Sequence, residues 1–445
     1  MRANLAKEVA HLAWPVILQG VLTTVVFFTD RLLLGTYSDE ALGSMQISGP
    51  VIWSMGSVLV AFATGSMAII GRSVGAEDRD RARDTLVTSL CLSVGIGLVM
   101  TVLGLSSMEA IAALMGGSPD TSQGMRDLAV VYMGVLFWAA PLSFVASSGI
   151  VALQASGDTR SPMWISAVAG VANLGLSWVL IFGHFAAPEL GMFGAAIGSV
   201  TSFALQAALV LTVLCRSKGI VGLLPLRKPT LAPLRPIFRV SGPTFAERII
   251  FHTAFLFFAG FVGHLGDVAM TANQSLIAIE SLGFMVSYAF GVAASTLIAQ
   301  KLGAEQPAEA EQCGWLSTAM GAALLSLIGL FFLIFAEPLV GLFSEDPEVI
   351  ALAATCLRVA AIAQPLMAVT DALAGSLRGA GDTRTPMLVA IIGPVVVRLS
   401  ACWLLAFEWE MGLLGIWVAT TIDWSVRCLA LALVFRRGAW KRIEV

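Results

Sequence analysis

The sequence predicts an all-α protein that crosses a membrane many times, and three observations carry this prediction. Of its 445 residues, 57% are hydrophobic and only 12% are charged, whereas soluble domains carry about 25% charged residues. Apolar runs of about 20 residues, the length that a helix needs to cross the hydrocarbon core, recur along the chain. The second half of the sequence also repeats the first. This composition argues against a water-soluble enzyme.

Twelve segments are long and apolar enough to span a bilayer, since a helix rises about 1.5 Å per residue and the core is about 30 Å thick. They are 10–34, 44–70, 87–108, 127–154, 161–183, 191–215, 243–263, 268–298, 315–338, 350–374, 386–407 and 412–435. We therefore predict an N-terminal six-helix lobe at 1–215, a cytoplasmic linker at 216–242 and a C-terminal six-helix lobe at 243–445. The linker is basic, with Arg216, Lys218, Arg227, Lys228, Arg235 and Arg239.

The distribution of basic residues predicts the orientation, because Lys and Arg accumulate in short cytoplasmic loops. With a cytoplasmic N-terminus, 22 of the 26 Lys and Arg residues fall on the cytoplasmic side. The exceptions are Arg31, Arg126, Arg358 and Arg398, and only Arg398 is clearly inside a span and away from its ends. Both termini are therefore expected in the cytoplasm of a multi-pass protein of the cell (inner) membrane.

The two halves of the sequence can be superimposed with a slowly drifting offset. At offsets of 228, 224 and 221 residues, respectively, the matches include Gly75-Ala76-Glu77 with Gly303-Ala304-Glu305, Gly157-Asp158-Thr159-Arg160 with Gly381-Asp382-Thr383-Arg384, and Gly191 with Gly412. Each half has an even number of spans, so the repeats run in the same direction through the membrane. Such repeats are related by a pseudo-twofold axis along the membrane normal and are typical of transporters.

These duplicated turns also carry a family resemblance. The segments Gly71–Ala76 and Gln300–Ala304, together with Gln154–Arg160 and Leu377–Arg384, resemble those of multidrug and toxic compound extrusion (MATE) transporters, over essentially the whole chain. The resemblance implies a twelve-helix, two-lobe fold. It also implies export of amphipathic, often cationic compounds in exchange for protons or sodium ions.

Asp30 is the foremost candidate for binding the coupling ion, because an ionisable group inside a span is costly and marks function by default. Its counterpart at an offset of 228 is Phe258, so the acid belongs to the N-terminal half alone. The resemblance implies an aspartate at this point of the first helix that binds the cation. The alternative is an interfacial ion pair with the adjacent Arg31.

The resemblance adds polar residues of the fifth and sixth spans to this site, and the matching positions here are Asn173, Ser177 and Ser199. Asn173 and Ser177 are four residues apart and share one helix face. Ser177 stands where the family commonly has a second acid, so a sodium site with two acids is not expected. A single carboxylate favours protons over sodium as the coupling ion, and no metal or other cofactor is expected.

The C-terminal half has its own intramembrane polar residues. Glu280 and Asp371 are candidates either for lining the substrate cleft or for pairing with Arg398, which matches Asn173 at an offset of 225. Glu247 is a candidate for a salt bridge. The duplicated Gln46 and Gln274 are assigned to the cleft, with interhelical hydrogen bonds as the other interpretation. Pro15 lies in the first span, where it is a candidate for bending the helix in a gating motion.

We therefore predict a secondary antiporter that exports amphipathic, cationic compounds, acting as a monomer in the lipid bilayer without a nucleic-acid partner. No D-D-x-x-D, H-E-x-x-H or P-loop motif indicates an enzyme or an ATP-driven pump. A flippase for lipid-linked oligosaccharides or lipids is the closest alternative. Such a flippase would need several basic residues in its cleft to bind pyrophosphate.

Overall fold

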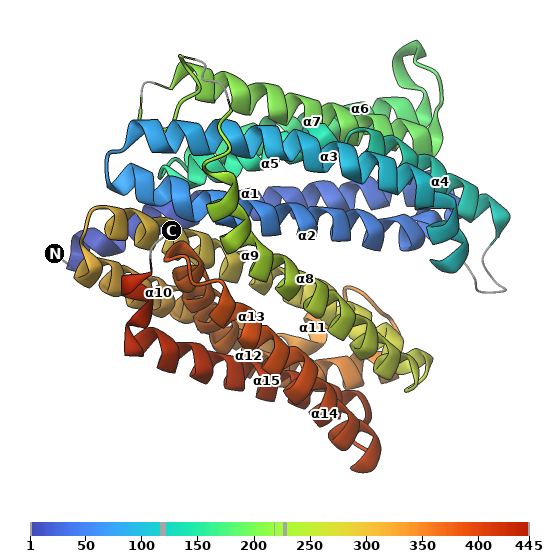
Figure 1. Ribbon diagram of the computed structural model, residues 1–445. Helices are drawn as coiled ribbons and strands as arrows, with labels where there is room; N and C mark the ends of the chain where they lie inside the picture. The colour runs from blue at the N-terminus through green and yellow to red at the C-terminus, as the bar shows by residue number, and fades with distance from the viewer. Residues whose placement is uncertain (1, 116–121, 218, 226–228, 444–445) are drawn as a thin grey trace. The chain divides into compact units, whose positions relative to one another are not determined.

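The computed structural model describes residues 2–115, 122–217, 219–225 and 229–443 (Figure 1). Within these residues the secondary structure is helical and contains no strand. Eleven of the described helices are long and apolar enough to span a membrane, and a bent helix pair brings the number to twelve if it counts as one span. The predicted all-α, many-span class is confirmed. Lys218, Arg227 and Lys228 of the predicted basic linker lie outside the described residues.

The described residues of the first half form seven long helices. They are α1 (Arg2–Tyr37), α2 (Asp39–Gly75), α3 (Arg79–Met115), α4 (Gln123–Trp138), α5 (Ala140–Ala155), α6 (Arg160–Phe182) and α7 (Gly191–Arg216), with the short η1 (His184–Ala186) before α7. The chain bends by 55° between α4 and α5, where one continuous span was predicted. Pro141 lies at the start of α5, where its missing amide hydrogen costs no intrahelical hydrogen bond.

The second half forms α8 (Leu234–Gly263), α9 (Asp267–Gly303), α10 (Pro307–Ile334), α11 (Ala336–Val340), α12 (Pro347–Gly379), α13 (Arg384–Ala390), η2 (Ile391–Arg398), α14 (Leu399–Cys402), η3 (Trp403–Glu408), α15 (Gly412–Arg437) and η4 (Ala439–Arg442). The span predicted at 386–407 is not uniform, because η2 and η3 are π-helical. Pro394 lies inside η2. Long π-helical stretches are rare, and π-bulges inside α-helices are frequent at functional sites.

The described chain divides into two compact units, and each is described by itself. Unit 1 comprises Met1–Ile17, Met67–Ala76 and Phe238–Val445, and unit 2 comprises Leu18–Ser66 and Glu77–Ile237. The predicted lobes at 1–215 and 243–445, and the symmetry between them, stay predictions.

Each unit has an apolar core between its helices. In unit 1, α12 packs against α9, α10 and α15. Small residues allow the α9–α12 approach, since a Cβ atom added to Gly375 or Gly379 would overlap the backbone of Gly291 or Ser295. In unit 2, α5 packs against α3 and α7, and α7 also packs against α6. Close helix packing through small residues is the common solution inside membranes, where apolar side chains gain little from leaving lipid.

The duplicated turns adopt matching backbone conformations in the two halves. Gly157, which follows α5, has φ 91°, and its counterpart Gly381, after α12, has φ 90°. An aspartate follows each glycine and its Oδ1 accepts a hydrogen bond from the backbone three residues on, at 2.9 Å for Asp158 and 3.1 Å for Asp382. Glycine is favoured there because a Cβ atom is strained at positive φ. The sequence repeat is therefore also a repeat of local structure.

Candidate functional site

The four residues predicted for ion coupling lie in unit 2 and are buried together. Asp30 on α1 is 8% exposed and Ser177 on α6 is fully buried. The Ser177 hydroxyl is the side chain beside the Asp30 carboxylate. Asn173, one turn before Ser177, donates through Nδ2 to Ser199 Oγ on α7 at 3.4 Å. Helix α1 and the consecutive helices α6 and α7, far from it in the sequence, thus bring one acid and three neutral polar groups into one cluster.

Three oxygens of this cluster have unused hydrogen-bonding capacity. Asp30 Oδ1, Asn173 Oδ1 and Ser177 Oγ are buried, and none has a hydrogen-bond partner among the described residues. The large majority of buried polar atoms in proteins are hydrogen-bonded, so an unsatisfied one calls for an explanation. A proton on the carboxylate, or a small cation among the oxygens, would satisfy them. The described residues hold no group of three or more His, Cys, Asp or Glu that would suit a metal ion.

A close approach of α6 and α7 positions two of these groups. Gly198 on α7 faces α6, and a Cβ atom there would overlap Ser177 Oγ and lie 3.3 Å from the Asn173 carbonyl oxygen. The absent side chain lets the helices approach closely enough for Asn173 to reach Ser199. Gly198 therefore contributes to the site by allowing the close packing of α6 against α7.

Tyr132 belongs to the cluster, although the sequence did not single it out. It lies on α4, is buried, and has the Ser199 hydroxyl beside it and Asp30 within electrostatic range. A tyrosine inside an apolar span is a weak signal by itself.

Arg31, the residue after Asp30, places its guanidinium 4.2 Å from the centre of the Phe27 ring. No salt bridge joins Asp30 to Arg31 among the described side chains, which speaks against the ion-pair interpretation of Asp30.

A second, ionic cluster lies in unit 1. Asp423 on α15 is fully buried, and its Oδ2 accepts hydrogen bonds from Arg398 Nε at 2.9 Å and from Arg427 Nη2 at 2.9 Å. Arg398 Nη2 lies 2.7 Å from the same oxygen. The Arg427 guanidinium also stacks on Trp424, 3.6 Å from the ring centre. The expectation that only Arg398 is basic inside a span is corrected: Arg427 is buried as well, where the sequence suggested a residue near a span end.

The acids predicted for the C-terminal half lie at different places in unit 1. Glu280 on α9 is buried and has Arg398 within electrostatic range, but no salt bridge joins the two among the described residues. Asp371 on α12 accepts a hydrogen bond from Ser287 at 2.6 Å. Glu247 on α8 forms a salt bridge with Arg378 at the end of α12. Arg398 therefore pairs with Asp423 rather than with either predicted cleft acid.

The remaining predicted residues are placed as follows. Gln46 on α2 and Gln274 on α9 are exposed. Pro15 is buried in α1, which continues as an α-helix through it. The border between the two compact units falls in this helix, between Ile17 and Leu18, one turn after Pro15.

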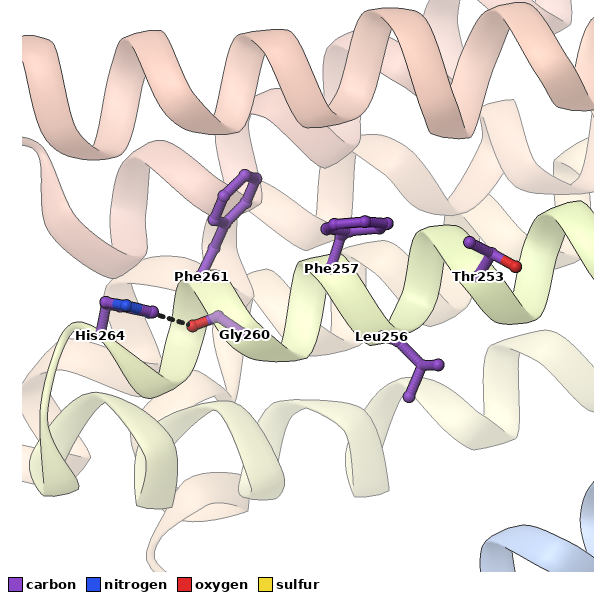
Figure 2. A pocket seen from close by; sticks show the side chains of 6 residues that line it. All are labelled: Thr253, Leu256, Phe257, Gly260, Phe261 and His264. Carbon is purple, nitrogen blue, oxygen red and sulfur yellow. Dashed lines mark hydrogen bonds between the residues drawn. The ribbon is translucent and has the colours of Figure 1, made fainter.

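An apolar recess of about 350 Å³ lies along α8, and none of the predicted site residues lines it. Figure 2 shows its lining residues, among them Phe257, Phe261 and His264, whose ring nitrogen Nδ1 is 2.8 Å from Gly260 O. No acid lines it. The recess therefore supplies an apolar surface rather than an ion site.

Buried ionisable groups inside a set of eleven or twelve apolar helices define a multi-span membrane protein of the transporter class. Comparison with known proteins agrees, since residues 15–179 and 243–404 match the MatE family. The chain belongs to the MatE family.

Two relatives and a solved structure illustrate the similarity. The chain is 28% identical over 448 residues to the probable multidrug resistance protein NorM of Thermotoga maritima, covering 99% of this chain and 94% of that protein. It is 27% identical over 419 residues to the multidrug resistance protein NorM of Burkholderia vietnamiensis, covering 93% and 89%. A MOP superfamily transporter from Pyrococcus furiosus has the same fold, with a TM-score of 0.91 at 20% identity over 99% and 97% of the two chains.

Proposed function

We propose that this protein is a multidrug efflux antiporter that exports amphipathic, cationic compounds and takes up protons in exchange. Membership of the MatE family and the multidrug resistance proteins among its relatives support the transport class. The observation that carries the mechanism is the Asp30 cluster, where one buried carboxylate lies among neutral amide and hydroxyl groups. This combination supports a transporter rather than an enzyme.

Proton coupling is favoured over sodium coupling by the composition of this cluster. Asp30 is its only acid, and Ser177 occupies the place of a second carboxylate. One proton neutralises one carboxylate and needs no further ligand. A sodium ion would need several oxygen ligands at once, and Asp30 supplies the one carboxylate among the described residues of the cluster.

Coupling requires that ion and substrate bind with different affinity to two conformations of the protein. We propose that protonation of Asp30 shifts the equilibrium between the inward-open and outward-open states and releases the substrate outward. Pro15, close to the border between the compact units, is the proposed point at which α1 bends. Asp371, Gln46 and Gln274 are the proposed cleft residues that meet the substrate, and the salt bridge of Glu247 with Arg378 is the proposed gate contact.

The proposed setting is the inner membrane of a bacterium, with the protein as a monomer and both termini in the cytoplasm. The two lobes are proposed to be related by a pseudo-twofold axis along the membrane normal. The asymmetric distribution of Lys and Arg supports the orientation, and the matched turns at Gly157 and Gly381 support the repeat.

A lipid or lipid-linked oligosaccharide flippase is less well supported. The buried Arg427 and the partly buried Arg398 are the basic residues of unit 1 that a pyrophosphate group would use, yet both donate to Asp423. Binding pyrophosphate there would break a buried ion pair, which is costly.

The test is the Asp30→Asn variant in proteoliposomes loaded with a cationic dye such as ethidium. A proton gradient should drive dye export by the wild type, and the variant should lose about tenfold or more of that export because its amide cannot bind the proton. Asp127→Asn, which changes an exposed carboxylate on α4, is the matched control and should export normally. Proton-driven export by Asp30→Asn at the wild-type rate would refute the site, and export driven by sodium alone would refute the coupling ion.

A further inference from the structure

Glu280 is a buried acid in the C-terminal half that the proposed mechanism does not use. Its side chain is 5% exposed, and Oε1 has no hydrogen-bond partner among the described residues. An ionised carboxylate in such a place is costly unless it is paired. A drug-sized molecule has no access to an atom this deeply buried, whereas a proton needs only a transient path to water.

The guanidinium that would pair with Glu280 is occupied elsewhere. Arg398 lies within electrostatic range of Glu280. Its Nε and Nη2 atoms, however, lie 2.9 and 2.7 Å from Asp423 Oδ2. Arg427 Nη2 donates to the same oxygen, and Asp423 Oδ1 has no partner among the described residues. Asp423 Oδ2 thus accepts hydrogen bonds from both arginines, whereas Glu280 accepts one from neither.

This distribution permits a second arrangement in which each acid still has a cationic partner. If Arg398 turned to Glu280, Arg427 would still hold Asp423, so neither acid would be left without a partner. Arg398 is the last residue of the π-helix η2, in the turn after Pro394. A π-helix is less regular than an α-helix and frequently marks functional sites. A small change there is enough to re-aim a long side chain.

Of the cations near α9, Arg398 is the one whose charge acts on Glu280, whereas Arg248, Arg378 and Arg427 act on Asp371. Asp371, on α12, is held by Ser287 and lies within electrostatic range of Arg248, Arg378 and Arg427. Arg378 itself forms the salt bridge with Glu247. On α10, Glu309 pairs with Lys301 at the end of α9. Arg398 is therefore the cation that responds to the charge of Glu280, with Asp423 and Arg427 behind it.

We propose that Glu280 is a second proton-binding site, in the C-terminal half, and that Arg398 competes with the proton for it. With a proton on a carboxylate oxygen of Glu280, Arg398 stays on Asp423, as in the structure. When the proton leaves to water, Arg398 turns to the ionised Glu280. The inference rests on the proposed proton coupling and adds that exchange carries a proton in each half of the protein.

The experiment measures protons exchanged per ethidium in proteoliposomes for the wild type, Glu280→Gln and Glu280→Asp. The ratio should fall by about half in Glu280→Gln, because only Asp30 remains to carry a proton. It should stay at the wild-type value in Glu280→Asp, which keeps a carboxyl group. An unchanged ratio in Glu280→Gln would overturn the inference, whereas absence of proton-driven export by the wild type would overturn the proposed function instead.

A second measurement does not depend on folding of a Glu280 variant. Solubilised Asp30→Asn, which retains Glu280, should still release protons when ethidium binds, as followed by a pH-indicator dye in weak buffer. Absence of release from this variant, with release from the wild type, would overturn the second site.

The role of Arg398 is tested by the Arg398→Gln variant. Its pH profile of export should shift to higher pH, because the proton loses its competitor for Glu280, and Arg398→Lys should restore the wild-type profile. An unmoved profile would overturn the role of Arg398.

Discussion

The polar cluster around Asp30 is nearly neutral, whereas the cluster around Asp423 is ionic. At an offset of 221, Asp423 and Arg427 correspond to Ser202 and Gln206. In both halves the second residue of the pair donates to the first across one helical turn, at 3.3 Å from Gln206 to Ser202 and at 2.9 Å from Arg427 to Asp423. The helix geometry has been kept while the charges have changed.

The contrast indicates that the two clusters have different roles: the Asp423 cluster is compensated by the protein's own cations, and the Asp30 cluster is not. Around Asp30 the neighbouring groups of the cluster are neutral, so its charge has no fixed counter-ion, and the proposed proton from solution would balance it. Around Asp423 the protein supplies its own counter-ions in Arg398 and Arg427. A self-neutralised cluster holds helices together, whereas an uncompensated acid responds to the solution.

The largest effect is expected from making the first cluster resemble the second. Asn173→Arg places a guanidinium inside the Asp30 cluster, at the position that matches Arg398 at an offset of 225. The built-in cation should hold Asp30 ionised and lower proton-driven dye export by about tenfold or more. Asn173→Gln keeps the amide and is the control, for which a much smaller loss is expected. Export by Asn173→Arg at the wild-type rate would show that Asp30 does not need neutral neighbours.

The next largest effect is expected from removing the shared anion of the ionic cluster. Asp423→Ala leaves Arg398 and Arg427 buried without their partner, which should lower the free energy of unfolding by about 3–5 kcal/mol. Ser202→Ala, at the matching position of unit 2, removes one neutral hydrogen bond and should cost about 1 kcal/mol. Thermal unfolding in detergent measures both. Equal losses in the two variants would contradict the assigned difference between the clusters.

A smaller effect is expected from filling the close helix approaches beside each cluster. A Cβ atom at Gly393 would overlap Asp423 Oδ1, and one at Gly198 would overlap Ser177 Oγ. Gly393→Ala and Gly198→Ala should each lower the free energy of unfolding by about 1–3 kcal/mol through overpacking. Gly175→Ala on α6, where the added methyl meets open space, should not destabilise the protein. If all three variants unfold alike, close packing at these glycines is not what positions the clusters.

The smallest effect is expected at the aromatic face of the ionic cluster. Trp424→Phe weakens the cation–π contact with Arg427 and should cost about 0.5–1 kcal/mol. Trp164→Phe on α6, whose indole is mostly exposed, is the control and should change thermal unfolding less. The same loss in both variants would mean that the stacking on Arg427 contributes nothing measurable.

Much of the fold was predictable because local sequence patterns control it. Apolar runs of sufficient length identified the spans, and the duplicated Gly-Asp-Thr-Arg turns predicted a repeat that the φ angles of Gly157 and Gly381 reproduce. The bend between α4 and α5 and the π-helical η2 and η3 were not predicted. Pro141 and Pro394 mark these places, but a proline in a membrane span is compatible with a straight, a bent or a π-helical backbone.

The site was predictable only in part. Asp30, Asn173, Ser177 and Ser199 were identified through their spacing and the family resemblance, and the structure buries them in one unit. Tyr132 was missed because a phenol in an apolar span has no distinctive pattern. Arg427 was missed for a different reason: eight residues before the predicted end of its span, it resembles a side chain that reaches the membrane surface.

The sequence by itself determined the membrane class, the number of spans to within one, the duplicated turns and the rare acids inside apolar runs. These features follow from hydropathy and from short-range backbone chemistry. Only the tertiary structure decided which charges are compensated: Asp423 holds two arginines, whereas Asp30 and Glu280 keep a carboxylate oxygen without a hydrogen-bond partner among the described residues. Charge pairing depends on which helix faces pack together, and the sequence alone does not specify those contacts directly.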